Sequence, residues 1–377
     1  MLKKLDARMK KLLLIIVGGF VFLILVAIII FLVLNRKLTF DKVEMKMVEG
    51  AEKYFATNST RLPQIVGNYT EVKLDELVSG GYMKPVSKYV KDDNISCSGR
   101  VVVTKSGTFY NYSPYLNCGN YYVTSFLKDQ LKKTVVTNSD GLYEMTQINI
   151  GPNKEKNQAK NYVFRGDYVN NYIKIDNNVW RVVKIDSNDN IMVIYDELKF
   201  EDVWDDRFNK EINRDTGIND YEVSRAKKRI SDIYAGADFS DNLKRKFIPY
   251  DVCVGKRSEE DVINDGSIEC SKILSEQYFA LMPVYDYINA SLDSACKKVS
   301  DVQCKNYNYL TKFRYASWAF VTGNKNKSEQ VYSSNEGVGL GSYEARGKFI
   351  LRITGYLNKN VRIISGTGTS EDPYIVE

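Results

Sequence analysis

The chain has 377 residues, six cysteines and no histidine, and its formal net charge is +6. The absence of histidine excludes Ser-His-Asp and Cys-His catalysis, histidine metal sites and the usual general base near neutral pH. An enzyme of this sequence would depend on carboxylates, Lys, Tyr or Ser. We therefore predict no enzymatic activity, no cofactor and no metal ion.

The N-terminal part of the chain predicts a membrane anchor. Residues 1–11 contain five basic side chains against one acidic side chain, and residues 12–34 form an apolar run without any charge. As a helix this run would reach about 34 Å, enough to cross a hydrocarbon core of about 30 Å. Basic residues beside such a helix stay in the cytoplasm. We predict a cytoplasmic tail (1–11), a transmembrane helix (12–34) in the lipid bilayer of the cell membrane, and residues 35–377 outside.

The segment that follows, residues 35–57, predicts an amphipathic helical stalk. Val43, Met47, Ala51 and Phe55 recur every four residues, which places them on one face of a helix.

Residues 58–136 predict a small α+β domain similar in layout to a pilin. VKLDELVS reads as a short helix before Gly80-Gly81, and VVVTK and TFYNY around Ser106-Gly107 read as a β-hairpin. The polar stretch 137–160, which contains Gly151-Pro152, predicts a linker.

The cysteines predict three disulfides. Six cysteines in an exported segment suggest a disulfide framework, and these six fall into three pairs that are local in sequence. We predict the pairs Cys97–Cys118, Cys253–Cys270 and Cys296–Cys304. Free buried thiols are the alternative.

Residues 161–377 predict a larger β-rich domain. Alternating runs are separated by Asn/Asp turns, and residues 201–250 turn helical, with Val223, Ala226, Ile230 and Ile233 on one face and Ser240 as an N-cap.

Several segments of this region carry a family resemblance. They are YVFRG, NNYIKI, VWRVVKID, ALMPVYDYINAS, NYNYL, SWAFVT and SGTGTSEDPYIV. Together they resemble a domain of unknown function that is abundant in exported proteins of Gram-positive bacteria and is thought to be related to C-type-lectin-like and sulfatase-modifying-factor folds. The resemblance implies a C-type-lectin-like domain over 161–377. The paired active cysteines of the formylglycine-generating relatives have no counterpart, because no cysteine follows Cys304.

The N-terminal third resembles type IV pilins and pseudopilins in the order of its elements, although it has no processing site before the apolar run. The complete prediction is an α+β fold with a transmembrane helix, a helical stalk, a small disulfide-tied domain and a β-rich C-type-lectin-like domain.

Aromatic residues are the most suggestive candidates for binding. The chain contains 27 tyrosines and three tryptophans, and such side chains can stack on sugar rings or peptides. The competing interpretation is that Tyr simply suits half-exposed strands. The candidate binding residues are Tyr172, Trp180, Trp204, Tyr309, Tyr315 and Trp318.

Acidic clusters offer an alternative function. Glu201, Asp202, Asp205 and Asp206 form one cluster, and residues 259–261 form another. Glycoside hydrolysis needs two carboxylates across a cleft, whereas a solvated loop needs nothing further. Asp186 and the Asn/Asp residues after it match part of an EF-hand loop, but a hairpin turn explains them better.

From these features we expect a membrane-anchored extracellular binding or adhesion protein. It would present a surface to glycan, cell wall or another protein and would not bind nucleic acid. A pilin-like structural component and a carboxylate-dependent wall or glycan hydrolase are the alternatives.

Overall fold

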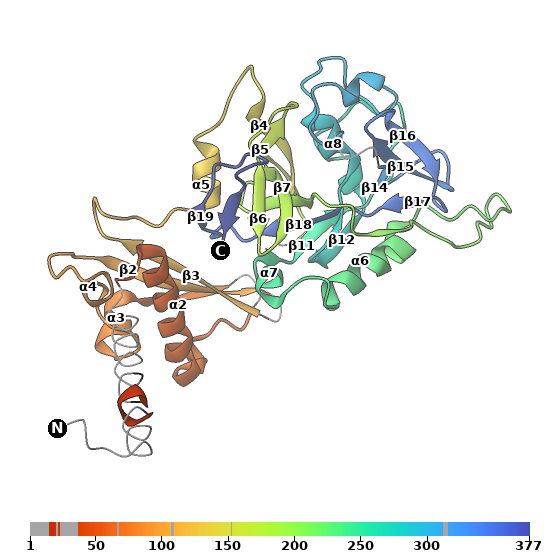
Figure 1. Ribbon diagram of the computed structural model, residues 1–377. Coiled ribbons are helices and arrows are strands. Elements are labelled where there is room, and N and C mark those ends of the chain that lie inside the picture. Colours follow the sequence, from red (N-terminus) through yellow and green to blue (C-terminus); the bar gives the residue numbers. More distant parts are fainter. Residues whose placement is uncertain are drawn as a thin grey trace, which may run out of the picture. The chain divides into compact units, whose positions relative to one another are not determined.

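The computed structural model describes most of the chain as a mixed fold of helices and strands (Figure 1). The chain divides into two compact units, the first made of Met1–Thr57, Val72–Val101 and Pro114–Val123 and the second of Asn58–Glu71, Val102–Ser113 and Thr124–Glu377. The described residues are 15–19, 22, 37–65, 68–106, 109–151, 153–311 and 316–377.

The predicted transmembrane helix requires a correction. Of residues 12–34, only 15–19 and 22 are among the described residues. Within the described parts of the chain, no helix has both the length and the apolar character needed to cross a membrane. This finding contradicts the predicted bilayer-spanning helix and the single-pass membrane placement, and neither is carried further.

The described residues from 37 to 117 form several helices and one small sheet. The sheet has the strand order β1-β2-β3. The elements are α2 (Phe40–Thr57), the 3-10 helix η2 (Ser59–Arg61), β1 (Tyr69–Lys73), α3 (Leu74–Ser79), α4 (Val86–Val90), β2 (Ser98–Ser106) and β3 (Phe109–Asn117).

Helix α2 is the core helix of the first unit and not a stalk. Val43, Met47, Ala51 and Phe55 are buried, as their spacing predicts. Glu44 is buried on the same helix, and its carboxylate accepts a hydrogen bond of 2.9 Å from the Tyr122 hydroxyl. A stalk is solvated all round, whereas this helix buries a full face, so the predicted stalk over 35–57 is wrong.

The first disulfide joins the two ends of the β2–β3 hairpin. Cys97 precedes β2 and Cys118 follows β3, and their sulfur atoms are bonded. Both the hairpin and its bridge are confirmed. A small domain has a thin core, so a bridge of this kind stabilises it by about 2–4 kcal/mol.

The second unit contains a ten-stranded sheet. Seven strands follow the order β10-β18-β8-β7-β6-β20-β19, while β13 pairs with β18, and β5 pairs with β4 and β7. The strands are β4 (Gly141–Ile150), β5 (Lys156–Arg165), β6 (Tyr172–Ile175), β7 (Asn178–Ile185), β8 (Ile191–Tyr195), β10 (Phe247–Ile248), β13 (Ala280–Leu281), β18 (Ile353–Leu357), β19 (Ile363–Ser365) and β20 (Tyr374–Val376).

Two further sheets and several short helices complete this unit. A five-stranded sheet has the order β16-β15-β14-β17-β9, and β11 pairs with β12. The strands are β9 (Glu201–Val203), β11 (Tyr250–Cys253), β12 (Ile273–Gln277), β14 (Trp318–Gly323), β15 (Gln330–Asn335), β16 (Gly339–Glu344) and β17 (Lys348–Ile350). The helices are α5 (Leu127–Lys132), η3 (Tyr221–Val223), α6 (Arg225–Ala235), α7 (Asp241–Arg245), η4 (Glu269–Ser271), α8 (Val284–Ala290) and η5 (Val302–Lys305).

Residues 137–160, predicted as a linker, mostly form paired strands instead. Strand β4 pairs with β5 along its whole length, from Gly141 opposite Arg165 to Ile150 opposite Lys156. The polar composition of this stretch reflects the many exposed or half-exposed side chains of the hairpin. A hairpin exposed to solvent resembles a linker in composition, which is why the prediction was wrong.

The core of the second unit is rich in aromatic rings. The indole of Trp180 on β7 has four rings within 6.0 Å of its centroid. These rings belong to Tyr195, Phe239, Phe247 and Phe279. They come from segments far apart in the chain, so this cluster holds the sheet and the short helices together.

The role of α2 can be tested on two methionines of the same helix. Met47 is fully buried, whereas Met45 is 44% exposed. We expect Met47→Ala to lower the free energy of unfolding of the first unit by about 2–5 kcal/mol because it leaves a cavity. Met45→Ala should change it by less than about 0.5 kcal/mol. Urea unfolding followed by circular dichroism measures both, and equal effects would contradict a core role for α2.

Candidate functional site

The tryptophans predicted to bind a ligand lie in the protein interior. Trp180, Trp204 and Trp318 are fully buried. The Trp204 indole donates a hydrogen bond of 2.9 Å to the Phe320 carbonyl. Tyr315 lies outside the described residues. These tryptophans stabilise the core and offer no surface on which a ligand could stack.

Two of the predicted tyrosines enclose a buried arginine. The Arg181 guanidinium carbon lies 4.2 Å from the ring centre of Tyr172 and 4.5 Å from that of Tyr309. Its Nε donates a hydrogen bond of 2.9 Å to Asn171 Oδ1. Cation–π contact of this kind stabilises a charge that has lost its water. These two rings therefore stabilise the buried charge of Arg181.

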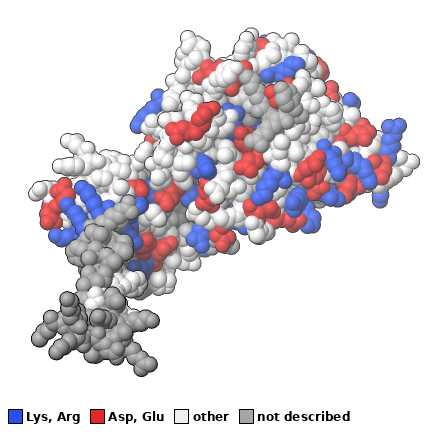
Figure 2. All heavy atoms as spheres, in the orientation of Figure 1, with Lys and Arg blue, Asp and Glu red and all other residues white. Residues whose placement is uncertain are grey.

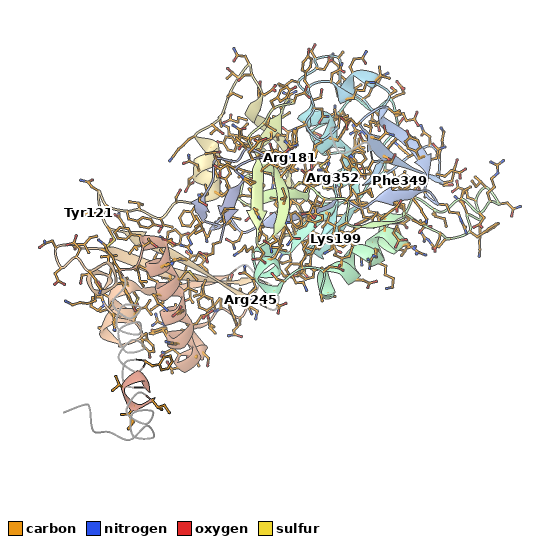
Figure 3. The ribbon with its side chains drawn as sticks, viewed as in Figure 1. Tyr121, Arg181, Lys199, Arg245, Phe349 and Arg352 are labelled. Carbon is orange, nitrogen blue, oxygen red and sulfur yellow. A yellow bond between two sulfur atoms is a disulfide. The ribbon has the colours of Figure 1, made fainter. Side chains whose placement is uncertain are left out.

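A second buried arginine, Arg352, packs against Trp318. Arg352 lies 4.9 Å from the ring of Trp318, and its Nη2 donates a hydrogen bond of 2.7 Å to Asp196 Oδ1. Burial lowers the pKa of Arg352 to about 10, against the opposing charge of Asp196. Figure 3 labels Arg181 and Arg352 within the larger unit. Three of the predicted binding residues, Tyr172, Tyr309 and Trp318, thus contact buried arginines.

The first acidic cluster is engaged in ion pairs. Arg225 lies 2.8 Å from both Asp202 and Asp206, and Arg207 lies 2.8 Å from Asp205. These residues line an open hollow of about 440 Å³. The hydrogen bond from Arg225 lowers the pKa of Asp206, whereas a glycosidase acid needs a raised pKa. On the face seen in Figure 2, positive and negative side chains are intermixed.

The sequence that partly matches an EF-hand forms the turn between β7 and β8. Asp186 Oδ1 accepts hydrogen bonds from the backbone N–H groups of Asn188 and Asn190, at 2.9 and 2.8 Å. The hairpin turn is confirmed, and the Asp186 side chain closes it.

Two loops of the second unit are each closed by a disulfide. Cys253 is bonded to Cys270, and Cys296 is bonded to Cys304. Both pairs are confirmed. The first bridge links the end of β11 to η4, just before β12, and the second closes a loop between α8 and η5.

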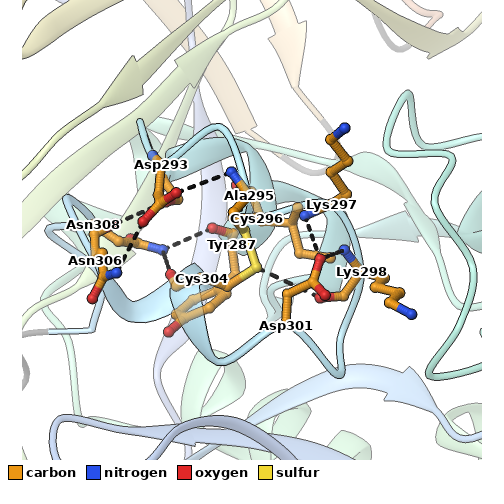
Figure 4. The surroundings of a disulfide bond; sticks show 12 residues. Tyr287, Asp293, Ala295, Cys296, Lys297, Lys298, Asp301, Cys304, Asn306 and Asn308 are labelled. Carbon is orange, nitrogen blue, oxygen red and sulfur yellow. Dashed lines mark hydrogen bonds between the residues drawn. A yellow bond between two sulfur atoms is a disulfide. The ribbon is translucent and has the colours of Figure 1, made fainter.

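The second loop is fixed by its own polar side chains (Figure 4). Asp293 accepts hydrogen bonds of 2.9 Å from the backbone of Ala295 and from the Asn306 amide. Asp301 Oδ2 accepts one of 2.8 Å from the backbone of Lys297. Both carboxylates stabilise the turns of this loop. The hydrogen bonds from Asn306 and Ala295 lower the pKa of Asp293.

The buried side chain of Asn308 joins this loop to the core. Its Nδ2 donates hydrogen bonds to the carbonyls of Tyr287 and Cys304, at 3.0 and 2.9 Å. Its backbone N–H donates to Asp167 Oδ1 at 2.8 Å. One asparagine thus connects the disulfide, α8 and the end of β5.

The two disulfide-closed loops also contact each other. Asn264 Nδ2 donates a hydrogen bond of 2.7 Å to the Lys297 carbonyl, and Lys298 forms an ion pair with Glu260. The hydrogen bond from Lys298 lowers the pKa of Glu260. Each loop therefore restrains the other.

A buried ion pair between Arg257 and Glu269 fixes the first loop, which is closed by Cys253–Cys270. Arg257 Nη1 lies 2.9 Å from Glu269 Oε1, and its Nη2 donates to the Ile263 carbonyl at 2.6 Å and to Asn264 Oδ1 at 2.9 Å. Burial raises the pKa of Glu269 to about 7, although Arg257 opposes the shift. The segment from Arg257 to Asn264 is held at several points.

Exposed apolar side chains lie on these restrained loops. We name them the disulfide-loop surface. Its residues and their exposed fractions are Val262 (60%), Ile263 (53%), Val302 (66%) and Tyr307 (58%). Sequence reasoning missed them because single apolar residues in polar loops have no period. The available signal was that Val262, Ile263 and Val302 lie between cysteines predicted to pair, and that Tyr307 lies shortly after Cys304.

Comparisons with family models, with curated proteins and with solved structures find no match for this chain. The likeness to the Gram-positive exported domain and the pilin-like layout therefore stay predictions.

The pKa of Glu269 gives a pH dependence with a definite sign. Because its folded pKa, about 7, lies above the ordinary 4.5, protonation favours the folded state. Its contribution to stability is complete below about pH 4.5 and is lost as the pH rises through 7. We expect Glu269→Gln to remove this part of the profile of unfolding free energy against pH.

The control for this experiment is Glu260→Gln, because Glu260 is exposed and its pKa is lowered by Lys298. Its contribution changes at acidic pH and not near pH 7. Parallel profiles for the wild type and Glu269→Gln would contradict the raised pKa.

Proposed function

We propose that this chain is a non-catalytic binding protein whose disulfide-loop surface contacts another protein. The observation that carries the proposal is the exposure of Val262, Ile263 and Val302 within the two disulfide-closed loops, and of Tyr307 just after the second loop. Exposed apolar patches bordered by polar groups are typical of interaction sites.

The rigidity of these loops favours binding. A partner that meets a flexible loop must order it, and this ordering costs free energy. Here Arg257, Asp301 and Asn308 already hold the backbone, through hydrogen bonds of 2.6–3.0 Å. A partner would gain the burial of the apolar side chains with little further loss of entropy.

The chemistry of the surface favours a protein over a sugar as partner. Three of its four residues are aliphatic, and such side chains gain most from contact with other apolar side chains. Sugar recognition by stacking uses aromatic faces, and the three tryptophans are buried. Tyr307 supplies the one aromatic ring of this surface.

The ion pairs of the acidic clusters support a binding role over hydrolysis. Asp202 and Asp206 share Arg225, and Glu260 pairs with Lys298. A retaining or inverting glycosidase needs one carboxylic acid that stays protonated until it reacts. Both Asp206 and Glu260 have lowered pKa values instead.

The proposal can be tested with a photoreactive amino acid placed at position 302 of the full chain, in cells that express it. Val223 is a matched control, because it is also an exposed valine (57%) but lies on η3, outside both disulfide-closed loops. We expect a discrete protein adduct from position 302 and none from position 223.

Charged variants then measure the contribution of the surface to affinity. We expect Val302→Asp to weaken binding of the captured protein at least about tenfold, or about 1.4 kcal/mol, with Val223→Asp unchanged. Equal adducts from both positions would contradict the proposal. So would binding of the full chain to a glycan array or to isolated wall material without any protein adduct.

A further inference from the structure

A lysine and an aspartate meet in the interior of the second unit. Lys184 lies on β7 and Asp286 on α8, 102 residues apart in sequence. Lys184 Nζ lies 2.8 Å from Asp286 Oδ1 and 3.0 Å from Oδ2. The two side chains are 4% and 0% exposed. The amine therefore contacts both carboxyl oxygens, with almost no access to water.

The surroundings hold the two groups in place. The Tyr285 hydroxyl accepts a hydrogen bond of 3.0 Å from Lys184 Nζ and so fixes the amine beside the carboxyl. The Tyr285 ring also lies 4.8 Å from the same nitrogen. Groups held at contact distance in a fixed orientation react far faster than the same groups in solution.

Burial also changes which protonation states are accessible. Burial raises the pKa of Asp286, although Lys184 opposes the shift. Burial alone would lower the pKa of Lys184, but the charge of Asp286, its hydrogen bond and the nearby Tyr356 and Asp186 together outweigh burial and raise this pKa. Charges are costly in a site without water. Transfer of a proton from the Lys184 ammonium to the Asp286 carboxylate gives a neutral amine beside a neutral carboxylic acid.

We propose that Lys184 and Asp286 condense into an intramolecular isopeptide bond. The Lys184 nitrogen attacks Asp286 Cγ and a C–N bond forms. The bond from Cγ to one carboxyl oxygen breaks, and this oxygen leaves as water with two protons, which come from the amine and the acid. The reaction needs no oxidant, reductant or cofactor. The product is a neutral amide in place of a buried ion pair.

The bond would tie the ten-stranded sheet to α8. Helix α8 contains Tyr287, whose carbonyl is bound by Asn308 beneath the Cys296–Cys304 loop. A covalent link from β7 to α8 therefore adds to the restraint on that loop. The inference does not depend on which partner the disulfide-loop surface binds.

Intact mass measurement tests the proposal on the full-length chain. After reduction of the disulfides, we expect a mass below that of the sequence by one water. Digestion should yield one branched peptide that joins Lys184 to Asp286. Lys132 and Asp189 form an internal control, because they also pair but are partly exposed, and they should stay unlinked. The full sequence mass, with Lys184 and Asp286 in separate peptides, would overturn the proposal.

Substitutions locate the reaction. Asp286→Ala and Lys184→Met should each restore the sequence mass. Asp286→Asn, which keeps the shape of the side chain, should lose ammonia in place of water and form the same amide. A loss of water that persists in Asp286→Ala or Lys184→Met would place the dehydration elsewhere in the chain and would overturn the proposal.

Discussion

The ion pair between Arg257 and Glu269 is the interaction on which the disulfide-loop surface depends. Both side chains are fully buried, so removal of either would leave a charge in the interior without its partner. Breaking a buried pair in this way costs about 3–5 kcal/mol. Because Arg257 also binds the Ile263 carbonyl and the Asn264 side chain, the pair fixes the backbone beside the exposed apolar residues.

The disulfides and the polar side chains act on the same loops by different means. A disulfide restricts the unfolded chain, whereas Asp293, Asp301 and Asn308 select one conformation of the folded loop. Disulfides persist under oxidising conditions. Under such conditions both restraints apply together, and the loops present their apolar residues in one arrangement. Such an arrangement supports the binding role proposed above.

Local patterns in the sequence predict the parts of this fold that depend on near neighbours. The four-residue spacing from Val43 to Phe55 gives the buried face of α2. The Ser240 hydroxyl caps α7 by accepting a hydrogen bond of 3.0 Å from the backbone N–H of Leu243. The three cysteine pairs, with separations of 21, 17 and 8 residues, are also local. Contacts across long separations leave no such pattern. Lys184 and Asp286 read as ordinary polar residues, and the buried state of Trp204 depends on Phe320, which is 116 residues away.

The central claim is that the two disulfide-closed loops are ordered before any partner binds. Hydrogen exchange on the free, oxidised chain tests it most directly, because exchange reports local opening of the backbone. We predict slow exchange for the Asn308 and Cys270 amides, which donate to Asp167 and to the Gly266 carbonyl. Exchange of both amides as fast as that of an unstructured peptide would contradict the claim.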